Sequence, residues 1–289
     1  MSHLFIFGEQ RTGSTLVHSL FRRHPQVVAT PNDFNITNLY KKGLKIFPHN
    51  KDLIKFMRWG FGDLFSLSNR LKKFKRAGTI KYIIEAYFKD SKELIKVHKT
   101  PKGEHELEYY REAFSEAFFL YTIRNPLGIL ASRKHWELIN NWKNLEGVGI
   151  NFERVKETLN TIRITLDRLF KSYKIIDENY WCGDTLGIIP YEQFVLDPVP
   201  ILRDLFKRLE IDNREQIIKE LFNISGPYTS YKDLKSKKGV YGESINRWEI
   251  MLTDFEKYLI YNEFKSFVDS YQFKSTQVEK VLRGYLNDK

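Results

Sequence analysis

A glycine-rich turn near the start of the chain carries the residue types that bind phosphate. Residues 8–15 read G-E-Q-R-T-G-S-T, between the apolar run 4–7 and a helical pattern from Leu16. A strand, a glycine turn and a helix start present backbone N–H groups to an anion. The glycine spacing is that of the phosphate loop G-x-x-x-x-G-K-[ST]. Ser14 stands where that loop has its lysine, and the cation comes earlier, at Arg11. We therefore expect the turn to hold an anionic nucleotide, but not ATP or GTP with magnesium.

A second cationic turn is expected where the apolar run 118–123 ends. Arg124 follows that run directly, and Pro126 is a residue favoured at the first position of a helix. Ser132 lies a little over two helical turns further along. Arginine supplies a forked cation and serine a small hydroxyl, and both groups suit phosphate oxygens. The spacing predicts that both side chains reach one phosphate.

The elements that must position these turns are short apolar runs that alternate with helical patterns. This alternation predicts an α/β fold of the P-loop-like kind, with three layers and a central, mostly parallel sheet flanked by helices. We expect a single domain over 1–289, with a helical insertion at about 34–93 that lines an acceptor site. Candidate strands cover 3–7, 26–30, 94–98, 118–123 and 186–190, and candidate helices begin near residues 15, 103, 126, 152, 199, 214, 253 and 276.

The composition bounds the partners and the compartment. Among 289 residues, 47 Lys and Arg against 36 Asp and Glu give a net charge of +11, which attracts anions. No nucleic-acid motif accompanies this charge, so we expect no nucleic-acid partner. The single cysteine excludes an internal disulfide and a cysteine-based metal site, and we expect no metal. No long apolar stretch or leader pattern is seen, which predicts a cytoplasmic protein without a membrane partner. The sequence does not indicate the oligomeric state.

Taken together, the two turns resemble a known family. R-T-G-S-T at 11–15 is similar to the loop that holds the 5′-phosphosulfate in sulfotransferases using 3′-phosphoadenosine 5′-phosphosulfate (PAPS). The segment 124–132 resembles the R-[ND]-P-x-x-x-x-x-S segment that holds the 3′-phosphate in that family. The resemblance runs over about 3–265, is weakest over 34–93, and favours the carbohydrate-type and bacterial members. Further likenesses are K-T-P at 99–101, Y-E-Q-F-V-L-D-P at 191–198, K-K-G at 237–239 and R-W at 247–248.

The resemblance implies in-line transfer of a sulfuryl group from PAPS to an acceptor hydroxyl, on a sugar or a small-molecule alcohol. The product nucleotide is 3′,5′-bisphosphoadenosine (PAP), and no metal takes part. Arg11 is the first candidate to stabilise the departing group, and Lys99 is the second. Tyr191 and Trp248 are candidates for packing around the adenine or its loop, although Trp248 is favoured as a core anchor. The implied donor-binding residues are Arg11, Thr12, Gly13, Ser14, Thr15, Arg124, Ser132, Tyr191, Lys237, Lys238, Gly239, Arg247 and Trp248.

Two residues compete as the general base that deprotonates the acceptor. Asp33 follows the second strand, near the place where carbohydrate-type relatives commonly have a glutamate. His98 is the rival, because an ordinary histidine pKa near 6.5 suits proton transfer. A structural role for His98 at the strand end is the interpretation that we favour over catalysis.

Two other functions stay open at this point. A P-loop kinase or NTPase needs a lysine after Gly13 and a metal-holding acid at a strand end, and this chain has Ser14 and strand-end cations instead. A non-catalytic nucleotide-binding or nucleic-acid-binding protein also agrees with the basic charge. Magnesium-dependent ATP binding would support the first. A steep salt dependence of binding to generic DNA would support the second.

Overall fold

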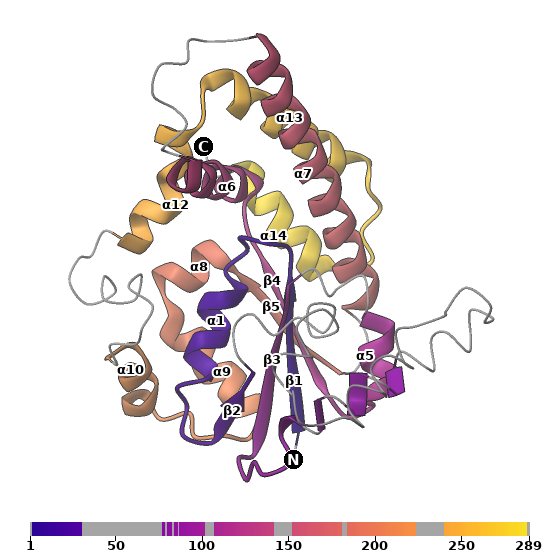
Figure 1. Ribbon diagram of the computed structural model, residues 1–289, viewed down its shortest axis with the longest axis vertical. Coiled ribbons are helices and arrows are strands. Elements are labelled where there is room, and N and C mark those ends of the chain that lie inside the picture. Colours follow the sequence, from indigo (N-terminus) through magenta and orange to yellow (C-terminus); the bar gives the residue numbers. More distant parts are fainter. Residues whose placement is uncertain are drawn as a thin grey trace, which may run out of the picture. The chain divides into compact units, whose positions relative to one another are not determined.

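A central sheet organises the fold. The computed structural model describes residues 2–30, 77–101 without 79, 83 and 86, 107–141, 152–180, 184–223 and 240–287. In this described part, five strands form one sheet in the order β2-β3-β1-β4-β5 (Figure 1). The predicted α/β fold, with a mostly parallel sheet flanked by helices, is confirmed. The strands are β1 (Ser2–Gly8), β2 (Val27–Ala29), β3 (Ile95–Pro101), β4 (Phe118–Ile123) and β5 (Thr185–Pro190).

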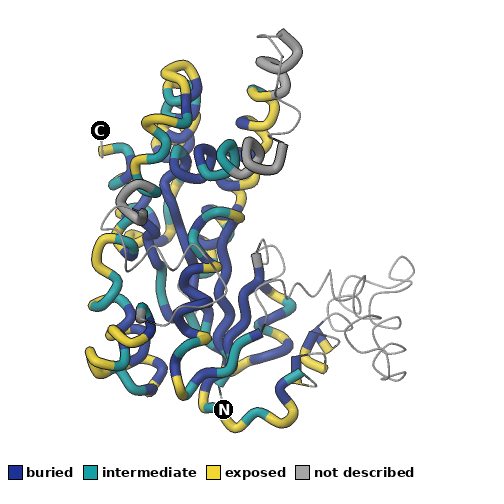
Figure 2. The backbone as a smooth tube through the Cα atoms, turned by 60° about the vertical axis from the view of Figure 1, so that its left-hand side comes forward, coloured by how far each residue is buried: buried dark blue, intermediate teal, exposed yellow. Residues whose placement is uncertain are grey.

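Continuous apolar runs explain the strands. Residues 4–7 of β1 are fully buried, and β4 is buried from residue 119 onward. Such unbroken apolar runs are typical of strands that are covered on both faces. Figure 2 shows the strands largely in the colour of buried residues. In the β2–β3 pair the strands run parallel, with Val27 opposite Ile95.

The third strand is longer than the sequence predicted. Its apolar run suggested an end at His98, yet β3 continues to Pro101. Lys99 and Thr100 are therefore strand residues rather than a following turn, and each is only 6% exposed. The Thr100 hydroxyl donates a 3.3 Å hydrogen bond to the carbonyl of Ile6. Lys99 and Thr100 are polar, so a pattern based on hydrophobicity ends the strand before them, although tertiary contacts bury both residues.

The chain divides into two compact units. The first consists of Met1–Phe7 and Ser14–Leu120, and it contains α1 (Ser14–Phe21) and α5 (Leu107–Ala113). The second consists of Gly8–Gly13 and Tyr121–Lys289. The single-domain organisation stays a prediction, and most of the expected insertion, residues 34–76, lies outside the described residues. The helices of the second unit are α6 (Pro126–Asn141), α7 (Phe152–Asn179), α8 (Tyr191–Leu196), α9 (Pro198–Arg208), α10 (Glu215–Asn223), α12 (Val240–Met251), α13 (Asp254–Ser270) and α14 (Thr276–Asn287).

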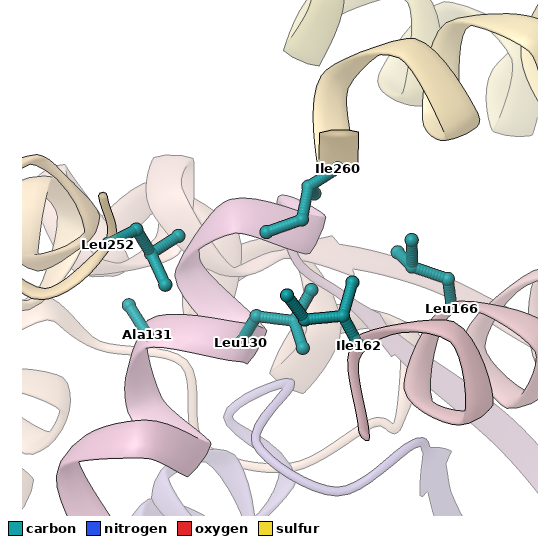
Figure 3. Packing of buried hydrophobic residues seen from close by; sticks show 6 residues of the cluster. All are labelled: Leu130, Ala131, Ile162, Leu166, Leu252 and Ile260. Carbon is teal, nitrogen blue, oxygen red and sulfur yellow. The ribbon is translucent and has the colours of Figure 1, made fainter. Parts of the chain in front are cut away.

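An apolar cluster holds the helices of the second unit together. Figure 3 shows Ile162 and Leu166 of α7 with residues from α6 and α13 and with Leu252, which directly follows α12. Trp248 of α12 packs against this cluster as a partly buried side chain. The cluster fixes α12 against α6, the helix that follows the second cationic turn. Its buried members are Leu130, Ala131, Ile162, Leu166, Leu252 and Ile260.

Helix starts agree with the sequence at most positions, and two described helices depart from it. The starts expected near residues 15, 126, 152, 199, 214, 253 and 276 lie within one residue of observed ones. The start expected near 103 lies outside the described residues, and α5 is described over Leu107–Ala113. Two helices, α8 and α12, were not predicted. In the described part of the chain, no helix is long and apolar enough to cross a membrane.

Candidate active site

The turn 8–13 has a strained and well-bonded backbone. The carbonyl of Glu9 accepts hydrogen bonds from the Thr12 amide at 3.3 Å and from the Thr12 hydroxyl at 2.7 Å. That hydroxyl also lies 2.7 Å from the hydroxyl of Thr122 in β4. Between the two ends, Arg11 has φ 74, a left-handed conformation that costs a non-glycine residue about 1–3 kcal/mol. Such strain persists only where the surroundings impose it, and it gathers at functional sites.

Arg124 closes the turn from the end of β4. Its side chain is buried, and Nη1 donates a 3.1 Å hydrogen bond to the carbonyl of Arg11. Nη2 donates a 2.8 Å bond to the carbonyl of Ser244 in α12. Nε lies 3.8 Å from Oε1 of Glu192. The arginine predicted at the second turn therefore also holds the strained residue of the first turn.

The R-N-P segment forms the start of α6 by its own chemistry. The Asn125 side-chain oxygen accepts a 3.0 Å hydrogen bond from the Leu127 amide, which is the usual N-cap contact. Pro126 is the first helical residue, where its missing N–H costs nothing. Glu192 Oε1 accepts the Asn125 amide at 3.1 Å. Ser132 lies further along α6 and is half-buried.

Cations crowd around this turn. Burial, and then the charges of Arg133 and Arg124, lower the pKa of Arg11 from its ordinary value. Burial, and then Arg247 and Arg11, lower the pKa of His135. Arg247 of α12 therefore shares the electrostatic surroundings of the turn. Because each shift includes repulsion between like charges, this part of the second unit favours a bound anion.

Two glutamates lie against this group of cations. Glu9 is 1% exposed, and its Oε1 accepts a 3.1 Å bond from Nη2 of Arg133 and a 2.9 Å bond from the Gln10 amide. Burial raises the pKa of Glu192, and the charge of Arg124 opposes that rise. Each carboxylate thus lies against one arginine. A group of several cations attracts a ligand with several negative charges.

In the first unit, Lys99 lies at the start of α1. Its Nζ donates a 3.0 Å hydrogen bond to the hydroxyl of Thr15. Ser14 and Thr15 form the first turn of that helix, where the helix dipole is positive. A buried ammonium at a helix N-terminus suits an anionic group, and the role of Lys99 in the transfer step stays a prediction.

The predicted rival base, His98, lies in an aromatic core. It is 1% exposed, its Nε2 is 3.0 Å from Nδ1 of His3, and its ring stacks on Phe5 at 4.6 Å. Burial, followed by the charge of His3, lowers the pKa of His98 well below the ordinary value. This position favours the structural interpretation of His98. Asp33, the other candidate, lies outside the described residues.

The remaining predicted residues divide between core and undescribed segments. Lys237, Lys238 and Gly239 lie outside the described residues. Trp248 packs on the apolar cluster, and Nζ of Lys257 lies 6.0 Å from its ring centre, which favours the core-anchor interpretation. Among the described residues, no group of three or more His, Cys, Asp or Glu side chains could hold a metal ion.

Sequence reasoning missed Glu9, Arg133 and Ser244. Glu9 carried a usable signal, since an acid inside a turn expected to bind an anion needs a compensating cation. Nothing in the sequence indicated that this cation is Arg133 of α6. Ser244 carried no signal, because it contributes its backbone carbonyl to Arg124.

Several solved structures resemble this chain in fold. A solved sulfotransferase domain from the Synechococcus PCC 7002 olefin synthase is 16% identical, with a TM-score of 0.53 over 100% of this chain and 96% of that one. The sulfotransferase domain from the curacin biosynthetic pathway is 13% identical, with a TM-score of 0.55 over 98% and 96%. Mouse sulfotransferase SULT7A1 complexed with PAP is 14% identical, with a TM-score of 0.52 over 98% and 89%.

At these identities the solved structures show a shared fold. No curated protein matches the sequence. The sequence model of the sulfotransferase family matches residues 3–215, which is most of the chain and includes both cationic turns. The chain therefore belongs to the sulfotransferase family.

Proposed function

We propose that this protein transfers a sulfuryl group from PAPS to a hydroxyl of a carbohydrate or small-molecule acceptor. The observation that carries the proposal is the group of arginines around the strained turn, in which the charges of Arg133 and Arg124 lower the pKa of Arg11 after the effect of burial. PAPS carries a 3′-phosphate, a 5′-phosphate and a sulfonate, so it matches a site with several cations. ATP chemistry would need the loop lysine that Ser14 replaces.

Each turn has its own task in this proposal. The backbone N–H groups of residues 12–15 and the start of α1 hold the 5′-phosphosulfate. Arg11 stabilises the negative charge that develops as the sulfonate leaves, and Lys99 is the second cation for that work. Arg124 and Ser132 hold the 3′-phosphate, together with one of the lysines at 237–238.

The acceptor side is the less determined part of the proposal. Asp33 is our candidate for the base, because His98 is enclosed in the aromatic core. The segment 34–93 is proposed to line the acceptor pocket, and its aromatic content suits either a sugar or an apolar alcohol.

The direct test is transfer of a labelled sulfuryl group. Purified protein is incubated with ³⁵S-PAPS, EDTA and a panel of sugars, phenols and alcohols, and the products are separated. We expect a labelled acceptor and release of PAP. Arg11→Ala should lower turnover by about 10²–10³. Arg214→Ala is the matched control, because its side chain is 75% exposed and pairs with Asp212. Failure to bind PAP and to label any acceptor would contradict the proposal.

The 3′-phosphate role is tested by comparing two nucleotides. Arg124→Ala with Ser132→Ala should weaken the binding of PAP far more than that of AMP, which lacks the 3′-phosphate. Equal losses for both nucleotides would remove these residues from the 3′-phosphate. Magnesium-dependent ATP binding in the same assay would favour the kinase alternative instead.

A further inference from the structure

We propose that Thr122 is a positioning residue for the turn 8–13, which holds the strained backbone at Arg11 and does not touch the nucleotide. The Thr122 hydroxyl, the Thr12 hydroxyl and the Glu9 carbonyl form a chain of hydrogen bonds that we call the hydroxyl relay. The inference rests on the proposed function, because it adds a residue to the turn that would hold the 5′-phosphosulfate. No pattern in the sequence assigned a role to Thr122.

Thr122 is a buried polar residue in an apolar strand. β4 reads F-F-L-Y-T-I, and Thr122 is 1% exposed near its end. Valine has nearly the same shape, suits a buried strand equally well and carries no polar group. Burying a hydroxyl is unfavourable unless the hydroxyl is hydrogen-bonded. The hydroxyl of Thr122 therefore needs a partner, and the turn supplies one.

The distances determine the direction of both hydrogen bonds in the relay. Oγ1 of Thr12 lies 2.7 Å from the carbonyl of Glu9, which can only accept, so the Thr12 hydroxyl donates there. A hydroxyl has one proton, and this bond uses the proton of Thr12. The 2.7 Å contact between Oγ1 of Thr12 and Oγ1 of Thr122 therefore has Thr122 as its donor.

The relay ends on the carbonyl that closes the turn. The Glu9 carbonyl also accepts the Thr12 amide at 3.3 Å, which makes residues 9–12 a four-residue turn. Arg11 is its third residue, and φ 74 there is a conformation that such turns usually give to glycine. An arginine keeps this conformation only where surrounding contacts impose it. The bond from Thr122 to the residue directly after Arg11 is one of these contacts.

Thr122 also lies directly against the start of the turn. A Cβ atom at Gly8 would lie 2.2 Å from Oγ1 of Thr122 and 2.6 Å from Oγ1 of Thr12. The two hydroxyls therefore occupy the space of a side chain at that position, and glycine is the residue that fits there. The turn thus contacts Thr122 on both sides of Arg11, at Gly8 and at Thr12.

The relay should control the direction of the Arg11 side chain. A change of the backbone angle φ at Arg11 would turn its Cβ atom away from its present direction. A cation that is fixed before charge develops stabilises that charge without reorganisation. Thr122 should therefore act on turnover through Arg11, and on affinity through the part of the nucleotide that the turn would hold.

A double-mutant cycle on turnover tests the inference, with labelled PAPS and the acceptor identified in the panel. Thr122→Val removes the donor and should lower kcat about 3–10-fold, the effect of one buried hydrogen bond. Thr122→Ser keeps the hydroxyl and should restore kcat to within about 2-fold of the wild type. In the Arg11→Ala background, Thr122→Val should cost less than about 2-fold, because it acts through Arg11.

Thr161→Val is the matched control, because Thr161 is an exposed residue of α7, and its kcat should equal that of the wild type. If the added methyl group of Thr122→Val crowds Thr12 and prevents folding, Thr122→Ala removes the hydroxyl without that methyl group and replaces it. An equal loss of kcat in both backgrounds, or a serine variant no better than valine, would overturn the inference.

A comparison of two nucleotides gives a second readout. PAP carries the 5′-phosphate that the turn would hold, and adenosine 3′-phosphate lacks it. Thr122→Val should weaken PAP binding about 2–5-fold and leave the binding of adenosine 3′-phosphate unchanged, since one hydrogen bond of the turn is lost. A general loss of structure would weaken both nucleotides equally, and that result would overturn the inference.

Failure of the relay and failure of the proposed function give different results. If the wild-type protein binds no PAP and labels no acceptor, the proposed function fails. The relay is then judged by thermal unfolding without ligand, where Thr122→Val and Thr12→Val should be coupled because they break the same bond. Additive losses of stability would overturn the relay whatever the protein binds. Binding of PAP together with additive unfolding would overturn the relay and leave the function intact.

Discussion

Replacing Glu9 with glutamine should lower stability and strengthen anion binding at the same time. Glu9→Gln keeps the shape of the side chain and the acceptor for the Gln10 amide, but it removes the charge that faces Arg133. Breaking a buried pair by neutralising one partner costs about 3–5 kcal/mol. Arg133 is 15% exposed and keeps its 2.8 Å bond to Thr165, so we expect the lower end, about 3 kcal/mol.

The effect on a bound nucleotide has the opposite sign. Two unit charges, such as that of Glu9 and one on a bound nucleotide, interact by about 2 kcal/mol if they are about 8 Å apart at an effective dielectric constant of about 20. Screening by salt reduces this energy to about 1 kcal/mol. PAP carries several charges, so about tenfold tighter binding is a modest expectation. At 100 times its Kd, a ligand adds about 2.7 kcal/mol, and tenfold tighter binding adds about 1.4 kcal/mol more.

The assay is thermal unfolding with and without PAP. At about 2 °C for each kcal/mol, PAP should raise the Tm of the wild-type protein by about 5 °C and that of Glu9→Gln by about 8 °C, while the variant alone melts about 6 °C lower. Glu215→Gln removes an exposed carboxylate that pairs with Arg203, and both of its melting temperatures should match the wild type. A PAP shift in Glu9→Gln that is equal to or smaller than the wild-type shift would refute the reasoning about excess charge.

Three further outcomes follow from the described residues. Gly13→Ala should abolish PAP binding, because its Cβ would lie 2.3 Å from Tyr191 at a backbone φ of 93; isothermal titration checks this, and retained affinity would show that the ring can move. His3 has its pKa lowered to about 4, mainly by burial, and the pKa of His98 is also lowered, so the folded state keeps both rings neutral. The unfolded chain takes up protons below about pH 6.5, and unfolding free energy should therefore fall as pH drops from about 6.5 to 4. In urea unfolding, His3→Phe should make this slope shallower, and an unchanged slope would exclude His3 as a source. Arg11→Lys should keep the charge but lose turnover, measured with labelled PAPS, because lysine lacks the planar fork; full activity would mean that a point charge suffices.

The strands and the two turns were predictable because their signals are local. Residues 4–7 and 118–123 are unbroken apolar runs, and each is followed at once by a cationic turn. The start of α6 was equally readable, since Asn125 and Pro126 cap it by contacts within the same segment. Where a few neighbouring residues determine the structure, the sequence is enough.

The parts that escaped prediction depend on distant partners. The end of β3 was missed because Lys99 and Thr100 look solvent-exposed in sequence, and only tertiary bonds to Thr15 and Ile6 bury them. The contacts of Tyr191 and Ser244 with Arg124 join residues far apart in the chain, which no periodicity can show. Helix α12 follows residues 224–239, which lie outside the described chain, and its position depends on packing against α6.

Arg124 also bears on how far the chain can be shortened. The sequence model of the family ends at residue 215, which suggests that the residues after it are not needed for the fold of the site. Yet the Ser244 carbonyl holds Nη2 of Arg124, whose Nη1 holds the carbonyl of Arg11. The hydroxyl of Tyr285 likewise reaches the carbonyl of Ile123, one residue before Arg124. Contacts of the two turns therefore extend to α12 and α14, beyond the family boundary, and we expect a polypeptide that ends at residue 215 to lose both of them.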